Sequence, residues 1–459
     1  MAKSISRRRF MAYSGGLFAG AAGLGACQTT ISARSRAPNI VLILADDLGY
    51  GDVGCYGCED TRTPNIDRIA AEGVRFTSFY SNGPECTPTR TALLTGRYQH
   101  RVGGLECAIG TGNVGRYDDA IRLRQTHDLG LPASETSIAR MLKSAGYVTG
   151  VCGKWHLGYE PKFFPSNHGF DHWFGPVGGA TDYFHHREAT GERAVYLNGQ
   201  PVDREGYLTD LITEESVGFI RRNQGHPFFL YVAYTAPHTP YQGPSDKRAD
   251  PVAEADYNKG SRNTYVAMVE RMDEGIGAIW RALRDTGVSQ DTLVIFMSDN
   301  GGANMGRNTP FSGNKGNLFE GGIRVPCVVG WPGILPPGAT SDLPCMTMDF
   351  SQSIVRVAGA QSPRPFDGID ILNLVETGQS VQNRTLFWRA RRGEWTRKAV
   401  RVGAMKYIAL DNAGKTHEYL FDLGVDPREK NNLVAEQPET TLRLRQLLKE
   451  WEDKVRPAR

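Results

Sequence analysis

The stretch Asn39–Ala45 reads Asn-Ile-Val-Leu-Ile-Leu-Ala and runs directly into Asp46 and Asp47. A short apolar run of this kind, bounded by polar residues, is typical of a strand that is buried on both faces. Such strands occur where helices cover both sides of a parallel sheet. The stretch therefore predicts an α/β fold that begins near Pro38, with two carboxylates at the end of its first strand.

Further apolar runs repeat this arrangement: Thr292–Met297 before Asp299 and Asn300, Tyr147–Cys152 before Lys154 and His156, and Phe228–Tyr234 before His238. Helical patterns lie between the runs, at Pro64–Glu72, Ser134–Ala145 and about Asn263–Arg284. This alternation favours a sheet with parallel strands. Because ligands bind beyond the carboxyl ends of such strands, we expect the polar groups to form one site.

The residues that follow Asn39–Ala45 and Thr292–Met297 offer only oxygen atoms as metal ligands: Asp46, Asp47, Asp299 and Asn300. Oxygen ligands suit calcium or magnesium better than zinc. One such pair alone would more often be a helix cap or a turn. Two pairs at strand ends favour a divalent metal instead.

The other polar groups could supply positive charge or protons to an anionic substrate: Lys154, His156, His238 and Lys315, the last within Gly313–Gly316. Each alone would more often be a surface lysine or a structural histidine. Together with the oxygen ligands, these groups predict a site that binds an anionic substrate.

The first 27 residues resemble an export leader. Arg7–Arg9 precede an apolar stretch, Ala12–Gly25, that is too short and too glycine-rich for a membrane span. The arginines followed by Phe10 resemble a twin-arginine signal, and Leu24–Cys27 resembles a lipobox, which would place a lipid on Cys27. We expect export to the periplasm or outer cell envelope, with residues 28–37 as a tether and the lipid as the membrane attachment. An ordinary signal peptide is the alternative.

The formal net charge of +3 includes four cations before Cys27, Lys3 and Arg7–Arg9, and no acid precedes Cys27. Removing the leader brings the net charge to about −1. The remainder holds no run of basic residues interleaved with aromatic ones, which argues against nucleic acid as a partner.

The chain has eight cysteines, of which six have no assigned role: Cys55, Cys58, Cys107, Cys152, Cys327 and Cys345. Cys55 and Cys58 have the spacing of a redox or zinc motif, but no second pair at ligand spacing follows. Buried thiols and a structural disulfide are the remaining alternatives, and spacing does not decide the pairing.

The segment Pro84–Arg97 reads Pro-Glu-Cys-Thr-Pro-Thr-Arg-Thr-Ala-Leu-Leu-Thr-Gly-Arg. It resembles the sulfatase signature, in which cysteine or serine, any residue, proline, any residue and arginine are followed by a helical turn and Thr-Gly-Arg. Thr89 departs mildly from the family, where serine or alanine is more usual. The resemblance covers nearly the whole chain, from Pro38 through Gly321–Pro326 to Tyr419–Pro427 and Asn431–Val434.

The resemblance implies that a maturation enzyme converts Cys86 to formylglycine, whose hydrated aldehyde carries two hydroxyls on one carbon. One hydroxyl would attack sulfur, and the other would later expel sulfate and regenerate the aldehyde. Pro88 and the residues after it are consistent with Cys86 at the N-terminus of a helix, where an anion is favoured.

The same resemblance implies one calcium ion, close to the modified Cys86 and held by Asp46, Asp47, Asp299 and Asn300. Arg90 would orient the formylglycine, and Lys154 would contact sulfate. His156 would take a proton from the hydrated aldehyde during sulfate elimination. His238 and Lys315 would bind sulfate and help to protonate the leaving alcohol.

The family's fold is a large alkaline-phosphatase-like α/β domain, with a mixed, mostly parallel sheet flanked by helices, and a smaller C-terminal α+β subdomain with an antiparallel sheet. We place the boundary between residues 38–360 and 361–459. Arg397–Gly403 and Met405–Leu410 alternate as strands, and Thr440–Val455 has the pattern of a closing amphipathic helix.

A sulfated carbohydrate is the expected substrate, with rings and cations from three segments as candidate contacts: residues 182–186, residues 307–312, and Trp388, Arg389 and Arg391. Two alternatives come from other classes of protein. One is a phosphate or phosphonate ester hydrolase of the same superfamily. The other is a non-catalytic lipoprotein that binds sulfated glycans.

Overall fold

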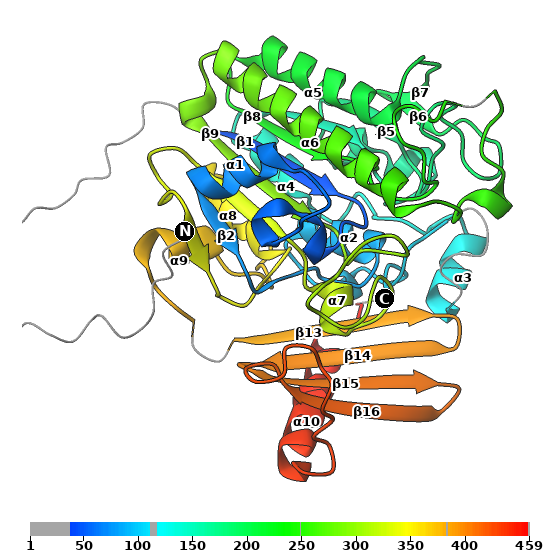
Figure 1. The fold of residues 1–459 in the computed structure, drawn as a ribbon, viewed down its shortest axis with the longest axis vertical. Coiled ribbons are helices and arrows are strands. Elements are labelled where there is room, and N and C mark those ends of the chain that lie inside the picture. Colours follow the sequence, from blue (N-terminus) through cyan, green and yellow to red (C-terminus); the bar gives the residue numbers. More distant parts are fainter. Residues whose placement is uncertain (1–36, 111–116, 248, 382–383, 458–459) are drawn as a thin grey trace, which may run out of the picture.

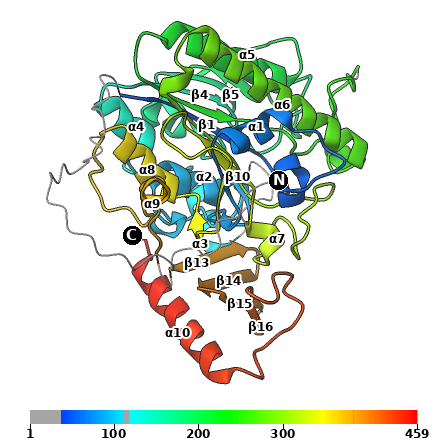
Figure 2. The same ribbon diagram turned by 60° about the vertical axis from the view of Figure 1, so that its left-hand side comes forward.

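The computed structural model describes residues 37–110, 117–247, 249–381 and 384–457. The expected leader, the lipid on Cys27 and residues 28–36 of the tether lie outside these ranges. Among the described residues we find no helix with the length and apolar character that a membrane crossing needs. Figures 1 and 2 show a large layered unit and, beside it, a smaller antiparallel sheet with a terminal helix.

A ten-stranded sheet runs through the large unit in the order β11-β2-β10-β9-β1-β8-β4-β5-β6-β7. The strands are β1 (Asn39–Ala45), β2 (Val74–Phe76), β4 (Val148–Gly153), β5 (His172–Pro176), β6 (Val195–Leu197), β7 (Gln200–Pro201), β8 (Phe228–Ala233), β9 (Thr292–Ser298), β10 (Cys327–Gly330) and β11 (Ala339–Ser341). The consecutive strands β9, β1, β8, β4 and β5 are parallel, whereas β10, β6 and β7 pair antiparallel with their neighbours. A separate parallel pair joins β3 (Phe79–Tyr80) and β12 (Cys345–Met346). The mixed, mostly parallel sheet confirms the prediction.

Helices cover both faces of this sheet. The helices that precede the smaller antiparallel sheet in the chain are α1 (Pro64–Glu72), α2 (Cys86–Thr95), α3 (Asp118–Gln125), α4 (Ile138–Ser144), α5 (Leu208–Asn223), α6 (Arg262–Asp285), α7 (Glu320–Ile323), α8 (Asp349–Val357) and α9 (Ile371–Thr377). The predicted helix Ser134–Ala145 begins later, because the Ser137 hydroxyl accepts a hydrogen bond from the backbone N–H of Arg140 at 3.1 Å and caps α4 there.

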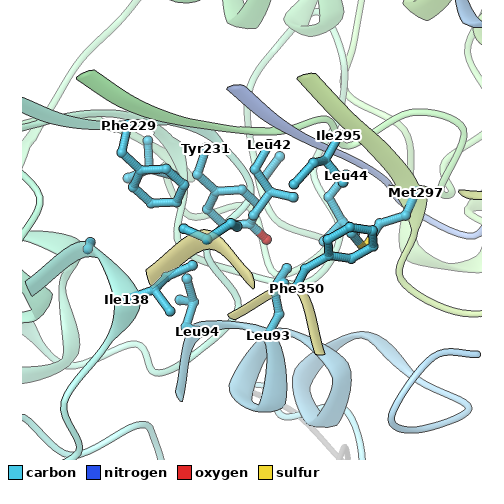
Figure 3. Close-up of a cluster of buried hydrophobic side chains, with 14 of the residues drawn as sticks. Leu42, Leu44, Leu93, Leu94, Ile138, Phe229, Tyr231, Ile295, Met297 and Phe350 are labelled. Atoms are coloured by element: carbon cyan, nitrogen blue, oxygen red, sulfur yellow. The ribbon is translucent and has the colours of Figure 1, made fainter. Parts of the chain in front are cut away.

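The side chains of β1 alternate between two apolar cores. Leu42 and Leu44 belong to the core that α2, α4 and α8 cover, where they gather with Leu93, Leu94, Ile138 and Phe350 (Figure 3). Val41 and Ile43 point to the opposite face and belong to the core under α1, α5 and α6. A strand with a core on each face must be apolar throughout, which explains the run that predicted it.

The smaller unit is an antiparallel meander of β13 (Thr385–Arg392), β14 (Trp395–Val402), β15 (Met405–Asn412) and β16 (Lys415–Asp422), followed by α10 (Pro438–Lys454). Its core includes Trp388, whose indole N–H donates to the Ser81 carbonyl of the large unit at 2.8 Å. Lys406 is fully buried and pairs with Glu320 at 2.8 Å and Glu429 at 2.9 Å. These contacts join the meander to the large unit.

Replacing Lys406 with methionine should lower the free energy of unfolding by about 3 to 5 kcal/mol, because Glu320 and Glu429 then lose the cation between them in a buried place. The matched control is Lys398→Met, since Lys398 lies in the same sheet, is 31% exposed and pairs with Glu452. It should change stability by about 1 kcal/mol or less. Urea-induced unfolding measures both variants, and equal losses would contradict a structural role for the buried pairs.

Candidate active site

The carboxyl ends of two neighbouring strands bring the predicted oxygen ligands together. Asp46 and Asp47 follow β1, and Asp299 and Asn300 follow β9, its parallel neighbour. The backbone N–H of Asp47 donates to Asp299 Oδ1 at 3.2 Å, and Asn300 Nδ2 donates to Asp47 Oδ1 at 2.7 Å. The structure therefore places these four side chains in one cluster, as the pattern predicted.

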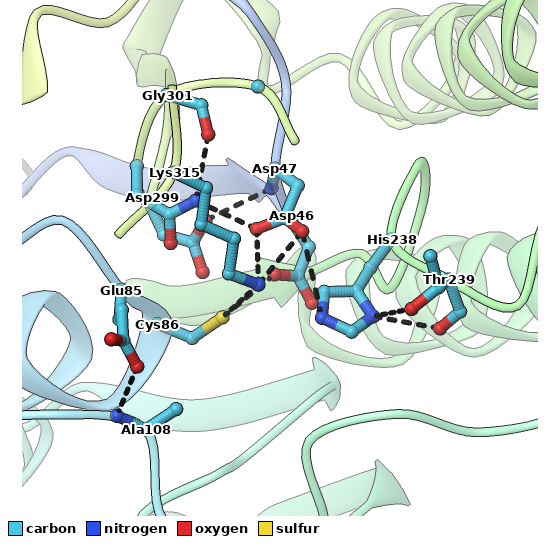
Figure 4. A network of polar contacts seen from close by, with 12 residues as sticks. Asp46, Asp47, Glu85, Cys86, Ala108, His238, Thr239, Asp299, Gly301 and Lys315 are labelled. Carbon is cyan, nitrogen blue, oxygen red and sulfur yellow. Dashed lines mark hydrogen bonds and ion pairs between the residues drawn. The ribbon is translucent and has the colours of Figure 1, made fainter. Parts of the chain in front are cut away.

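Cys86 is the first residue of α2, and its thiol lies at the edge of this cluster (Figure 4). Cys86 Sγ is 3.2 Å from Asp46 Oδ1, 3.4 Å from Lys154 Nζ and 3.7 Å from Lys315 Nζ. Burial raises the pKa of the Cys86 thiol well above its usual value, and the carboxylates of Asp299 and Asp46 add to the rise. The encoded side chain is therefore a protonated thiol near neutral pH.

Arg90 lies one helical turn after Cys86 and is fully buried. Its Nε and Nη2 donate to Asp299 Oδ2 at 3.2 and 2.9 Å, and its Nη1 donates to the carbonyl of Lys154 at 3.0 Å. Burial and the Asp46 carboxylate raise the pKa of Asp299 to about 6, although Arg90 opposes this rise. Arg90 thus ties α2 to the ends of β9 and β4.

The two lysines reach the cluster from different segments. Lys154 follows β4 and its Nζ lies 2.5 Å from Asp46 Oδ2, whereas Lys315 lies in the loop before α7 and its Nζ is 2.8 Å from Asp47 Oδ2. Burial alone would raise the pKa of Asp47, but Lys315 lowers it to about 2. Gly153 has φ +118°, and a Cβ there would lie 1.8 Å from the Ala233 carbonyl oxygen, so only glycine permits this turn into Lys154.

Two histidines border the same cluster. His156 Nε2 donates to the carbonyl of Ile109 at 2.6 Å, which leaves its Nδ1, a buried atom without a hydrogen-bond partner, as the acceptor. His238 Nδ1 donates to the carbonyl of Thr239 at 2.8 Å, and its Nε2 lies 3.6 Å from Asp47 Oδ2. Burial lowers the pKa of His156 well below its usual value, and burial with Lys315 lowers that of His238 to about 3. Both rings are neutral.

The cluster has the donors that a hard cation needs. One ligand atom from each of Asp46, Asp47, Cys86 and His238 lies within 4.8 Å of the others. Asn300 Oδ1 is buried and accepts no hydrogen bond, although Asn300 Nδ2 is fully used. An orphaned buried oxygen beside three carboxylates fits a divalent cation with oxygen ligands.

The cluster forms the floor of a pocket of about 760 Å³. Asp47, Cys86, His156, His238 and Lys315 line its floor, and its walls include residues for which no sequence motif had pointed to a site: Tyr159, Glu188, Glu254, Tyr257 and Arg392. A volume of this size accommodates a ligand much larger than a sulfate group.

Most of the substrate contacts expected from the sequence have structural partners instead. Trp388 is buried against Ser81, and Arg389 pairs with Glu106 at 2.7 Å. Asp182 is buried, and its carboxylate accepts hydrogen bonds from the backbone of the next residues, so it stabilises a turn. Arg307 pairs with Asp60 at 2.9 Å. The residue of β13 that lines the pocket is Arg392, which pairs with Glu85, the neighbour of Cys86, at 2.6 Å.

The cysteines of the described residues are free thiols: Cys55, Cys58, Cys86, Cys107, Cys152, Cys327 and Cys345. The sequence left buried thiols and a structural disulfide as alternatives, and the described residues contain thiols and no disulfide. Cys58 Sγ donates to Asp60 Oδ1 at 3.2 Å.

The family model described as Sulfatase matches residues 38–360 of this chain. This chain belongs to the sulfatase family. Sulfatases are sulfuric ester hydrolases, so the reaction of this enzyme is the release of sulfate from an ester. A second model, N-sulphoglucosamine sulphohydrolase, C-terminal, matches residues 313–456 of the sulfatase.

Named relatives of this sulfatase include enzymes for carbohydrate and aryl esters. It is 36% identical to the N-acetylgalactosamine-6-sulfatase of Sus scrofa over 391 residues, which cover 80% of this chain and 71% of the relative. It is 32% identical to arylsulfatase A of Bos taurus over 476 residues, which cover 92% and 88% of the two chains.

The solved structure of Ps i-CgsB in complex with k-i-k-neocarrahexaose resembles this sulfatase with a TM-score of 0.78 and 31% identity, covering 91% of this chain and 93% of that one. The phosphonate monoester hydrolase of Agrobacterium radiobacter shares the fold, with a TM-score of 0.62 and 19% identity, covering 91% of this chain and 96% of that one.

Replacing Arg90 with lysine should lower kcat/KM for a small aryl sulfate about 100-fold, because a lysine does not reproduce the paired contacts to Asp299 and the contact to the Lys154 carbonyl. Arg62→Lys is the control, since the Arg62 side chain is 85% exposed, pairs with Glu270 and does not line the pocket. Steady-state kinetics gives kcat/KM for both variants, and circular dichroism shows that both fold. Similar kcat/KM values in the two variants would contradict a positioning role for Arg90.

Proposed function

We propose that this sulfatase uses a formylglycine made from Cys86 and one calcium ion to release sulfate from a sulfated carbohydrate. The observation that carries the proposal is the place of Cys86 Sγ. It lies on the floor of a pocket, beside the Asp46 carboxylate and within 3.7 Å of the ammonium groups of Lys154 and Lys315. A nucleophile at the position of this sulfur atom would meet a sulfate group between the ammonium groups of Lys154 and Lys315.

The electrostatic surroundings of Cys86 support its modification. Burial and two carboxylates keep the thiol protonated, and a protonated thiol is a poor nucleophile. A formylglycine at this position would supply, as its hydrate, two hydroxyls for attack on sulfur and for later release of sulfate. A formylglycine-generating enzyme is therefore the expected maturation partner.

Calcium would be held by the oxygen atoms of Asp46, Asp47, Asp299 and Asn300, beside residue 86. The free acceptor of Asn300 and the carboxylates of Asp46 and Asp47 support this assignment, and Asp299 Oδ1 lies beside them, where it accepts from the backbone N–H of Asp47. The ion would supply a Lewis acid that neutralises charge on the sulfate oxygens.

The side chains of this chain account for the remaining steps. Lys154 and Lys315 would bind sulfate oxygens, and Arg90 would hold the modified residue 86 in place through its fixed contacts at the start of α2. His156 would accept a proton at its unpartnered Nδ1 during sulfate elimination.

Protonation of the leaving alcohol falls to Lys315. Although burial opposes it, the carboxylates of Asp47 and Asp46 raise the pKa of Lys315 well above its usual value, so Lys315 carries hydrogen atoms that it can donate. His238 Nε2 faces the same place, beside Asp47, but the hydrogen of the neutral ring is on Nδ1, which donates to Thr239. His238 would therefore contact the bound ester without protonating it.

A sulfated carbohydrate agrees with the size and the lining of the pocket. Its volume of about 760 Å³ and the tyrosine rings of its walls suit one or more sugar rings. A relative that is 36% identical carries the name N-acetylgalactosamine-6-sulfatase, and the similar solved structure was determined with a neocarrahexaose.

We further propose the chain's organisation as a twin-arginine-type lipoprotein signal at 1–27, a tether at 28–37, a catalytic domain at 38–360 and a C-terminal subdomain at 361–459. Lipid on Cys27 would hold the enzyme at the periplasmic side or the outer cell envelope. The match of the Sulfatase model to residues 38–360 supports the third boundary.

Modification of residue 86 is tested by peptide mass spectrometry on protein expressed with a formylglycine-generating enzyme. The peptide should have lost hydrogen sulfide and gained oxygen, and the protein should cleave 4-nitrophenyl sulfate. Cys86→Ala should fold and have no turnover, whereas Cys107→Ala, which removes another buried thiol, should keep it. An unmodified Cys86 with full turnover would reject the formylglycine.

Calcium binding is tested by thermal unfolding with and without the ion. Calcium at about 1,000 times its Kd should stabilise the protein by about 4 kcal/mol, and a chelator should remove both this gain and the turnover. Asn300→Leu should lose most of the gain, because it removes the free oxygen ligand. The control Asn304→Leu, at an exposed position of the pocket wall, should keep the gain. Equal calcium-induced shifts in both variants would exclude Asn300 as a ligand.

A further inference from the structure

Glu188 is a half-buried acid in the wall of the active-site pocket that the proposed chemistry leaves without a role. It begins a turn in which its N–H donates to the Glu192 carbonyl at 3.0 Å and its carbonyl accepts from the Gly191 N–H at 2.8 Å. These backbone contacts fix the turn, and the side chain lines the pocket that also contains Cys86 and His156. The carboxyl group is therefore on the same pocket surface as the reacting centre.

The carboxyl group of Glu188 has an unused hydrogen-bonding atom. Its Oε1 is buried and has no hydrogen-bond partner. The backbone makes room for this oxygen, because a Cβ on Gly178 would lie 1.6 Å from Glu188 Oε1. At the adjacent Gly179, a Cβ would lie 2.8 Å from the ring of His156. Oε1 therefore lies against the backbone of Gly178, and the side chain of Glu188 as a whole lines the pocket, where a ligand hydroxyl could meet the carboxyl group.

The charge of Glu188 suits a neutral partner. Burial raises the pKa of Glu188 to about 7, Lys154 opposes this rise and Glu192 adds to it. The side chain is therefore a neutral carboxylic acid at mildly acidic pH and donates or accepts hydrogen bonds as needed. The phenol-bearing rings of Tyr159 and Tyr257 line the same pocket, and they present apolar surface beside the carboxyl group.

We propose that Glu188 is a specificity-determining residue that hydrogen-bonds to a free hydroxyl of the sugar bearing the scissile sulfate. Above pH 7, where Glu188 is ionised, a sugar with a second sulfate or a carboxylate at that position is disfavoured, because two anions would then face each other. This inference rests on the proposed function, since it names the part of a sulfated carbohydrate that the pocket wall selects.

The kinetic test compares Glu188→Ala and Glu188→Gln with Glu214→Gln. Glu214 is a suitable control because its side chain is 65% exposed, pairs with Arg204 and does not line the pocket. The probes are 4-nitrophenyl sulfate, which has no sugar hydroxyl, and a panel of monosulfated galactose, glucose and N-acetylgalactosamine. For the sugar that wild type cleaves best, Glu188→Ala should raise KM about tenfold with kcat within about twofold, and Glu188→Gln should restore most of the affinity. Glu214→Gln should match wild type, and 4-nitrophenyl sulfate at pH 6 should be cleaved equally by all four proteins.

The pH dependence provides a readout that a structural role would not produce. A carboxyl with a raised pKa is neutral below that pKa and ionised above it, so wild-type KM for 4-nitrophenyl sulfate should rise above pH 7 as Glu188 becomes an anion near the sulfate. The groups that act on Glu188 are Lys154, Glu192, Tyr159 and Tyr257. Glu188→Gln removes the titrating group and should flatten this rise, whereas Glu214→Gln should retain it.

The outcomes separate this inference from the proposed function. Selective loss of sugar affinity in Glu188→Ala, with a flattened pH profile in Glu188→Gln, supports it. Two outcomes overturn the inference alone, both with 4-nitrophenyl sulfate cleaved by wild type. In the first, no sugar of the panel is cleaved. In the second, the KM values for the sugar are equal in all variants. If wild type with a modified residue 86 cleaves no ester at all, the proposed function and the inference are overturned together.

Discussion

Three carboxylates and three cations meet at the ends of β1 and β9, all of them buried except the partly exposed Lys315, and the arrangement of the large unit follows from the need to keep them paired. A buried charge without a partner destabilises a fold strongly. The carboxylates come from the two strands, but each cation comes from elsewhere: Arg90 from α2, Lys154 from the end of β4 and Lys315 from the loop before α7. The charges therefore require these separate segments to meet at one edge of the sheet.

The same requirement explains why the pocket has two kinds of surface. Its floor is crowded with ion pairs, and the bonds of Arg90 to Asp299 and to the Lys154 carbonyl restrict its movement. Its walls come from turns and from the hairpin that ends β13, and Arg392 of that hairpin pairs with Glu85 beside Cys86. The smaller unit thus contributes to the site as well as to stability. A floor built on strand ends is rigid, whereas walls built on turns can differ between relatives without disturbing the ion pairs.

Patterns along the chain predicted the parts of the fold in which local sequence decides the outcome. The limits of β1 and α1 agree with the structure to the residue, and Cys86 begins a helix as its following residues indicated. The contacts of long side chains were harder to predict, because distant partners decide them. Arg389 is separated from its partner Glu106 by 283 residues, and nothing in the local pattern distinguishes it from Arg392, which lines the pocket. Glu188 was missed for the same reason, since its surroundings come from glycines and a turn that carry no motif.

The difference between floor and walls also bears on how selectivity arises. A sulfate group has the same charge in every sulfate ester, so the cations of the floor bind all of them alike and supply little discrimination. Discrimination has to come from groups that contact the rest of the substrate. Neutral hydrogen-bonding groups are suited to this, because a buried group left unpaired by a wrong substrate reduces affinity more than a mismatched apolar contact does. A half-buried acid with a raised pKa, such as Glu188, can do both: while neutral it exchanges hydrogen bonds with a hydroxyl, and once ionised it opposes a second anion.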